Sequence, residues 1–243
     1  MNSDRFDVIT IGGSVIGCAI AYYLMQADDN LNVALIEMDP TYARASTTLS
    51  EGNIRVQFNI KENIQMSLYG LHVLNEFSDQ MAVGDEKPQV DFRQQGNLFI
   101  IDESSRPEAE QGYTLQRSLG CDVKWLSPKQ VQQHFPFYNL EGCVAGTFGY
   151  NDGTMSPEAV LTAYRKKLVS LGAHFIHAKV DRLLASDYQI NGVELSTGHK
   201  LTAGAVVNAA GAWAAASIDG ADRSHRAGDR PDGNRRGLDH QAP

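Results

Sequence analysis

The hydrophobic positions near the start of the chain form two short apolar runs on either side of a helix. Residues 6–11 are mostly apolar, rich in β-branched side chains and followed by two glycines, as expected of a buried parallel strand. Residues 15–26 carry small and apolar side chains suited to a tightly packed helix, and residues 32–36 form a second apolar run that ends at Glu37. This order predicts a strand–helix–strand unit with parallel strands.

Two longer stretches have helical spacing. One helix is predicted from Asn59, which has the spacing of an N-terminal capping pair with Glu62. Its apolar stripe comprises Ile60, Ile64, Leu68, Leu71, Leu74 and Phe77. A second helix is predicted from Ser156 to a stop at Gly172, with Leu161, Tyr164, Leu168 and Leu171 on one face.

Shorter elements are predicted between and after these helices. Residues 90–103 predict two short strands around Gly96, and residues 127–135, with Pro128 in the first position, predict a short helix. Four strands are then predicted at residues 173–177, 180–185, 189–196 and 205–209. The first of these is expected to return to the initial sheet as another βαβ-like unit.

Composition narrows the class of partner. The 243 residues carry a formal net charge of −8, which disfavours nucleic acid and anionic membranes, because both attract a basic face. The three cysteines have no CxxC spacing and the seven histidines are scattered, so neither a metal site nor a disulfide framework is expected. The apolar run 8–25 lacks a basic flank and a cleavage signal, which predicts no signal peptide or membrane span and a cytoplasmic protein.

The turn after the first predicted strand has the spacing of a dinucleotide fingerprint with one substitution. Gly12, Ser14 and Gly17 occupy its first, third and sixth positions, and Gly13 lies between them. Backbone N–H groups of this turn and the following helix would bind a pyrophosphate, and the Ser14 hydroxyl could add a hydrogen bond.

Glu37 lies 20 residues after Gly17, where the second strand presents a carboxylate to a ribose hydroxyl and repels a 2′-phosphate. A glycine fingerprint alone is weak and is also typical of an ordinary glycine-rich turn. Strand, helix, spacing and acid together favour a dinucleotide other than NADP.

Three further stretches follow the fingerprint in a family-specific order. They are ARASTTLSEGNIRVQF at 43–58, DGTMSPEAV at 152–160 and VVNAAGAW at 206–213. With the fingerprint they resemble the D-amino-acid oxidase superfamily of FAD-dependent oxidoreductases, and most closely its sarcosine and dimethylglycine dehydrogenase branch. The resemblance covers about residues 5–213 and implies FAD as the cofactor.

The resemblance also assigns residues around the flavin. It implies contacts from Ala45, Ser46, Thr47, Thr48, Val180, Ala210, Gly211 and Trp213. Arg55 resembles an arginine that holds the substrate carboxylate. Each has a plainer interpretation: residues 45–48 as a polar loop, Val180 and Trp213 as core residues, and Arg55 as a solvated arginine in a surface ion pair. Because no histidine lies between Glu37 and His72, non-covalent FAD is expected.

The fold class implied is α/β (α+β), with a Rossmann-like βαβ sheet and a partial, mostly antiparallel substrate domain. Residues 1–85 and 145–215 are expected to form the discontinuous FAD-binding domain, and residues 86–144 the partial substrate domain. Residues 216–243 are rich in Arg, Asp and Gly and are expected to form a disordered tail. Because this tail lacks the family's pattern, the chain is expected to be a truncated or frameshifted member.

The function implied is oxidation of the C–N bond of an amino acid or N-methyl amino acid, a small-molecule substrate, by hydride transfer to flavin. The electron acceptor is left open. One alternative is a non-catalytic flavoprotein or assembly factor of the same fold, or an inactive fragment. The other is an NAD-dependent dehydrogenase that uses the same glycine turn.

Overall fold

The computed structural model describes residues 4–186 and 188–215. Its first unit consists of β1 (Arg5–Ile11), α1 (Val15–Ala27) and β2 (Val33–Glu37). The two strands are parallel, with Val8 opposite Val33. The predicted strand–helix–strand unit is therefore confirmed, and every boundary lies within one residue of the prediction.

This unit forms the centre of a six-stranded sheet with the order β8-β2-β1-β11-β10-β9. The other strands are β8 (His174–His177), β9 (Val180–Ser186), β10 (Gln189–Leu195) and β11 (Lys200–Asn208). β8 is parallel to β2 and β11 is parallel to β1, whereas β9, β10 and β11 are joined by antiparallel pairing. The sheet is therefore parallel at its centre and antiparallel along one side.

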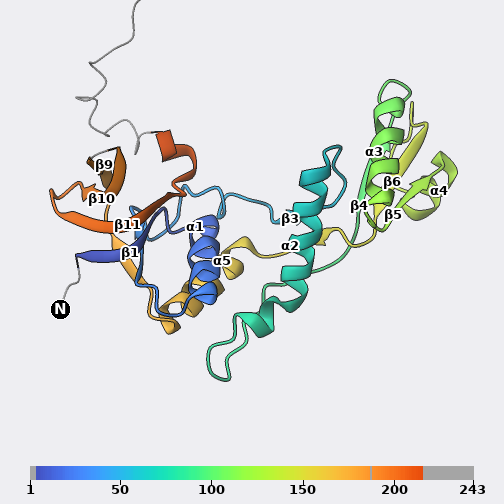
Figure 1. Ribbon diagram of the computed structural model, residues 1–243. Coiled ribbons are helices and arrows are strands. Elements are labelled where there is room, and N and C mark those ends of the chain that lie inside the picture. The colour runs from blue at the N-terminus through green and yellow to red at the C-terminus, as the bar shows by residue number, and fades with distance from the viewer. Residues whose placement is uncertain (1–3, 187, 216–243) are drawn as a thin grey trace, which may run out of the picture.

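Helix α5 (Pro157–Ser170) leads into β8, which confirms the predicted return to the first sheet. α5 packs beside α1 on one face of the sheet (Figure 1). Val8 and Leu35 point into this helix-covered core, while the alternate positions Ile9 and Ala34 belong to a separate cluster with Val193. Both faces of the central strands are buried, which explains their continuous apolar sequence.

A second, three-stranded sheet has the order β4-β6-β5 and is antiparallel throughout. It consists of β4 (Asn97–Ile101), β5 (Val123–Leu126) and β6 (Ala145–Gly149), and it lies beside α3 (Arg106–Ser118) and α4 (Pro128–His134). α2 (Lys61–Gln80) runs between this sheet and the six-stranded one (Figure 1). A two-stranded ribbon, β3 (Asn53–Ile54) with β7 (Gly153–Thr154), and a final 3-10 turn, η1 (Gly211–Trp213), complete the fold.

One prediction in the middle of the chain is wrong, and some elements there were not predicted. Residues 90–103 contain one strand, β4, instead of two, because Arg93 bridges only to Thr154 and Gly96 then turns the chain with a φ of 80°. α3 and β5 were not predicted at all. The segment of α3, RPEAEQGYTLQRS, is mostly polar, and its buried positions are Gly112 and Gln116, so its sequence has no apolar stripe.

The predicted N-terminal cap of α2 is also wrong. The helix begins at Lys61 after Ile60, and Asn59 does not cap it. The Asn59 side chain turns instead to α3, where its Nδ2 donates to Glu108 Oε1 at 2.7 Å. Gly112 leaves room for this contact, since a Cβ there would lie 2.3 Å from Asn59 Oδ1. A tertiary contact with α3 therefore replaces the local capping contact that the sequence pattern predicted for Asn59.

The division into domains stays a prediction. The pairing of β6 with β4 and β5 places residues 145–149 in the antiparallel sheet, so a division by sheets would fall after residue 149. The tail predicted at residues 216–243 lies outside the described residues.

Candidate functional site

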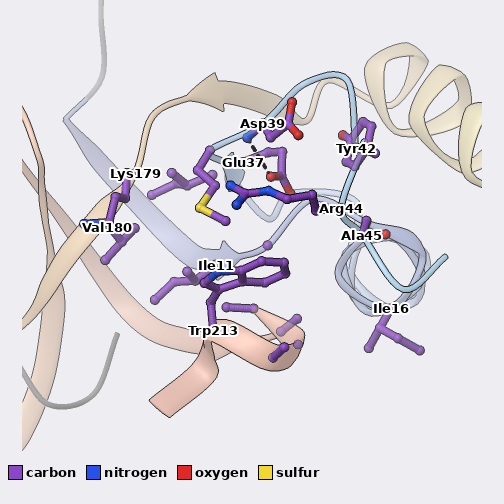
Figure 2. A pocket seen from close by; sticks show the side chains of 18 of the residues that line it. Ile11, Ile16, Glu37, Asp39, Tyr42, Arg44, Ala45, Lys179, Val180 and Trp213 are labelled. Atoms are coloured by element: carbon purple, nitrogen blue, oxygen red, sulfur yellow. Dashed lines mark hydrogen bonds between the residues drawn. The ribbon is translucent and has the colours of Figure 1, made fainter. Parts of the chain in front are cut away.

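A cleft opens where several strands of the large sheet end. It contains about 1110 Å³ of space, part of it open to solvent. Its walls come from the end of β1, the end of β2 and the loop after it, the start of β9, and the turn at η1 (Figure 2). Ligands of α/β folds bind at this place, beyond the carboxyl ends of parallel strands. Of the predicted cofactor residues, those lining it are Gly12, Ser14, Glu37, Ala45, Ser46, Thr47, Val180, Ala210, Gly211 and Trp213.

The glycines of the fingerprint are required by close main-chain contacts. Gly12 has a φ of +96°, and a Cβ there would lie 2.5 Å from the carbonyl oxygen of Ala209. A Cβ on Gly17 would lie 1.9 Å from the carbonyl oxygen of Gly12. Gly17 does not line the cleft, but it allows α1 to begin directly against the turn, so that Ser14 and Ile16 at the start of the helix line the cleft. The first N–H groups of a helix have no partner within it and can bind an anion.

Ser14 is the residue immediately before α1, and its side chain does not cap the helix. Its hydroxyl donates to Thr47 Oγ1 at 2.9 Å. The serine in the fingerprint thus ties the turn to the 45–48 segment, whereas the sequence suggested a phosphate as its partner.

Glu37 reaches from the end of β2 to the same turn. Its Oε2 accepts from the N–H of Gly13 at 2.9 Å, and its Oε1 accepts from the N–H of Asp39 at 2.9 Å. Gly13 itself is buried against this side chain, since a Cβ on it would lie 3.0 Å from the Glu37 Cβ. The structure therefore brings the acid and the glycine turn together, as their spacing predicts.

The remaining predicted residues line opposite sides of the cleft. Val180, at the start of β9, is 7% exposed and packs in the core while also lining the cleft, so both of its interpretations describe it. Trp213 on η1 faces the cleft and is half-buried (Figure 2). Thr48 does not line the cleft, because its hydroxyl turns away and donates to the carbonyl oxygens of Tyr42 and Ala45.

The structure adds Arg44, Lys179 and Tyr42 to the cleft, none of which the sequence singled out. The Arg44 guanidinium carbon lies 5.7 Å from the centre of the Trp213 ring, so it spans the cleft from the loop after β2 to η1 (Figure 2). The signal available in the sequence was position, because Arg44 directly precedes the predicted residues 45–48.

Cys18 lies beneath the glycine turn and is fully buried. Its Sγ donates to the carbonyl oxygen of Gly13 at 3.1 Å. Burial raises the pKa of this thiol to about 12, so the side chain is a neutral packing group under the turn. Within residues 4–186 and 188–215 there is no cluster of three metal-ligating side chains, and no helix in that part of the chain could span a membrane.

Arg55 lies outside this cleft, directly after β3. Its guanidinium carbon lies 4.8 Å from the centre of the Phe58 ring and 5.4 Å from that of Phe99. The Arg55 side chain is exposed and lies against these two aromatic rings, and among the described residues no ion pair includes it. The sequence prediction placed it at the substrate, and the structure places it at the ribbon to which residues 38–52 lead from the cleft.

These features fit an adenine dinucleotide. The glycines let the turn pack tightly against neighbouring main chain, and the start of α1, whose first N–H groups have no partner within the helix, lies at the cleft, where a pyrophosphate would fit. Glu37 supplies a carboxylate at the mouth of the second strand, where a ribose is bound in such folds. None of the residues lining the cleft is a histidine or a cysteine.

Comparisons with known proteins agree with this geometry. The family model described as FAD dependent oxidoreductase matches residues 7–233. FAD-dependent oxidoreductase domain-containing protein 1 of Xenopus laevis is 37% identical over 182 residues, which cover 73% of this chain and 36% of that protein. Mitochondrial dimethylglycine dehydrogenase of Homo sapiens is 27% identical, over 87% of this chain and 24% of that protein.

Among solved structures, L-proline dehydrogenase from P. horikoshii superimposes with a TM-score of 0.78 at 24% identity. The match covers 88% of this chain and 55% of that enzyme, and it shows the fold. The chain thus spans about a quarter to a half of the length of these relatives.

Proposed function

Because this chain belongs to the family of FAD-dependent oxidoreductases, we propose that it oxidises the C–N bond of an amino acid or an N-methyl amino acid. FAD is the cofactor of this family, and when bound it accepts a hydride from the carbon beside the amine nitrogen. The observation that carries the proposal is the pairing of a dinucleotide cleft with a separate, ring-supported arginine at the end of the segment that leaves the cleft.

The cleft residues bind and orient the cofactor. Main-chain N–H groups at the start of α1, after Gly12 and Gly13, would bind the pyrophosphate, and Glu37 would accept from the ribose hydroxyls. The main chain of Val180 would contact the adenine, and residues 45–47 would lie along the cofactor, with the chain continuing from there toward Arg55. Binding is non-covalent, since no histidine or cysteine lines the cleft.

Arg55 binds the carboxylate of the substrate. A guanidinium forms two parallel hydrogen bonds to a carboxylate and keeps its charge throughout the pH range of the reaction. The proteins named dimethylglycine dehydrogenase and L-proline dehydrogenase act on molecules in which a carboxylate lies one carbon from an amine. A fixed arginine would select this class and orient the carbon that loses the hydride. The imine product is then hydrolysed by water.

The test begins with the flavin of the purified chain. The protein is loaded with FAD under anaerobic conditions and mixed with sarcosine, dimethylglycine, L-proline and glycine, and the loss of the yellow absorbance is recorded. The proposal is supported if at least one of them bleaches the flavin and its carboxamide analogue, used in its place, does not. Lasting yellow colour with every substrate favours a non-catalytic flavoprotein or assembly factor, whereas a colourless protein that cannot be loaded contradicts the cofactor site.

A further inference from the structure

The main chain on both sides of Arg55 is fixed by one distant segment. Ile54 pairs with Gly153 in the β3–β7 ribbon. The N–H of Val56 donates to Asp152 Oδ1 at 2.9 Å. Arg55 therefore lies between two main-chain anchors, both of which come from residues 152–153. Its side chain is exposed, so these anchors decide where the guanidinium begins.

Asp152 is a fully buried carboxylate, and each of its two oxygens accepts a hydrogen bond. Besides Val56, its Oδ2 accepts from Gln57 Nε2 at 3.0 Å, and the same amide nitrogen donates to the carbonyl oxygen of Asn97 at 2.9 Å. The N–H of Gly96 donates to the Asp152 carbonyl oxygen at 2.8 Å. Through its side chain and its main chain together, Asp152 thus joins the Arg55 segment to the start of β4.

The surroundings are shaped around this carboxylate. A Cβ on Gly149 would lie 2.4 Å from Asp152 Oδ2, so only glycine leaves the space that the oxygen occupies. Burial raises the pKa of Asp152, and its hydrogen bonds and the nearby Arg55 charge act in the opposite direction. Burying a carboxylate lowers the stability of the fold unless the carboxylate is well paired. Its presence here therefore suggests a role other than core packing.

We propose that Asp152 is the positioning residue for Arg55 and thereby sets the affinity of the site for the substrate carboxylate. It acts by holding the Val56 N–H and the Gln57 amide, which fixes the segment that carries the guanidinium over the Phe58 and Phe99 rings. This inference rests on the proposed function, because it needs Arg55 to bind the carboxylate.

The test measures binding instead of turnover. Methoxyacetate keeps the carboxylate but has an ether in place of the amine, so it cannot be oxidised as an amine, and methoxyacetamide is its neutral control. Their dissociation constants are measured by calorimetry on the full chain loaded with FAD. The variants are Asp152→Asn, Arg55→Ala, the double variant, and Asp102→Asn, an exposed carboxylate that serves as the matched control.

Asp152→Asn keeps the shape but leaves one of two buried donors without an acceptor, so we expect about tenfold weaker methoxyacetate binding. Arg55→Ala should weaken it at least as much. The double variant should be no weaker than Arg55→Ala alone, because Asp152 acts through Arg55. The dissociation constants for methoxyacetamide and FAD should be unchanged in these variants, and Asp102→Asn should bind methoxyacetate as the unmodified chain does.

Three other results would overturn the inference. If Arg55→Ala weakens methoxyacetate but Asp152→Asn does not, the positioning role is wrong and the proposed function stands. If the two effects add in the double variant, Asp152 has a general structural role. If Arg55→Ala itself has no effect, the carboxylate role in the proposed function is wrong, and this inference is wrong with it.

A second variant keeps the test decisive if Asp152→Asn does not fold. Gly149→Ala retains the carboxylate and its charge but places a methyl group in the space of Oδ2. The carboxylate must then shift away from Gln57, and we expect the same loss of methoxyacetate affinity. Unchanged affinity in this variant would contradict the proposal as directly as unchanged affinity in Asp152→Asn.

Discussion

The cofactor cleft and the Arg55 segment are built in opposite ways. The cleft is formed where long strands of the six-stranded sheet end, and its turn is fixed by backbone contacts at Gly12 and Gly17. The Arg55 segment lies on a ribbon of two-residue strands, and one buried carboxylate, Asp152, is its other anchor. The first place depends on regular secondary structure, and the second depends on one side-chain network.

The two regions therefore differ in how the positions of their binding groups are fixed. A pyrophosphate is bound by main-chain N–H groups, which the strand and helix hold rigidly whatever the neighbouring side chains are. In the proposed function a substrate carboxylate is bound by one arginine, whose position depends on contacts far away in the sequence. Changes in the sheet should therefore abolish cofactor binding, and changes near the ribbon should alter only the substrate side.

The largest effect is expected from Gly17→Ala, which breaks the cleft. Its Cβ would lie 1.9 Å from the Gly12 carbonyl oxygen, so the turn and α1 must separate. We expect a loss of about 1–3 kcal/mol in the free energy of unfolding and no retained FAD. The matched control is Gly70→Ala in α2, where nothing lies within 4 Å of the added Cβ.

Gly70→Ala should stabilise the protein by about 0.5–1 kcal/mol, because alanine favours a helix interior. Thermal unfolding and the flavin-to-protein ratio report both variants. Equal flavin content in the two would show that the turn tolerates a side chain.

Gly153→Ala tests whether the two regions are independent. A Cβ there would lie 1.9 Å from the carbonyl oxygen of Arg93, so the β3–β7 ribbon must move. We expect substrate affinity to fall about tenfold or more, because the displaced Arg55 would lose a charge-assisted hydrogen bond to the carboxylate. The dissociation constant for FAD should be unchanged. A parallel loss of FAD affinity would mean that the ribbon supports the cleft as well.

Glu37→Gln should weaken FAD binding in the cleft without changing the shape of the side chain. The carboxylate accepts from the N–H groups of Gly13 and Asp39 with its two oxygens, and an amide can accept with only one. Losing one charged acceptor should weaken FAD binding about tenfold. A flavin titration measures this, and Glu51→Gln, an exposed residue outside the cleft lining, should show no change.

The smallest effect is expected at the contact that spans the cleft. Arg44→Ala removes the guanidinium above Trp213, a contact of about 0.5–1 kcal/mol at exposed sites, so FAD affinity should fall about two- to fivefold. Arg44→Lys keeps a cation and should lose less. Titration of FAD against protein fluorescence separates them, and equal affinity in all three proteins would remove Arg44 from the site.

The sequence predicted the cleft well because its signals are local. Continuous apolar runs indicate parallel strands, a glycine spacing indicates the turn, and a fixed offset places Glu37 at the next strand end. The resemblance to a flavoprotein family extended the same list to residues on η1 and β9, and the structure places Trp213 and Val180 in the same cleft.

Other parts had no such signal. Helix α3 is polar along most of its length, and Arg44 reaches the cleft only because η1 brings Trp213 opposite it. Asn59 matched a capping pattern but was taken by Glu108 of α3. In each case the outcome depends on a contact between distant segments, which the local sequence pattern does not record.

The sequence alone determined the strand–helix–strand unit, the glycine turn and the acid that faces it, because each depends on neighbours within about forty residues. Only the tertiary structure decided which distant side chains meet, above all that Asp152 holds the segment of Arg55 from almost a hundred residues away. A pattern along the chain records local periodicity, whereas a buried carboxylate finds its donors only after two sheets and the ribbon between them have packed.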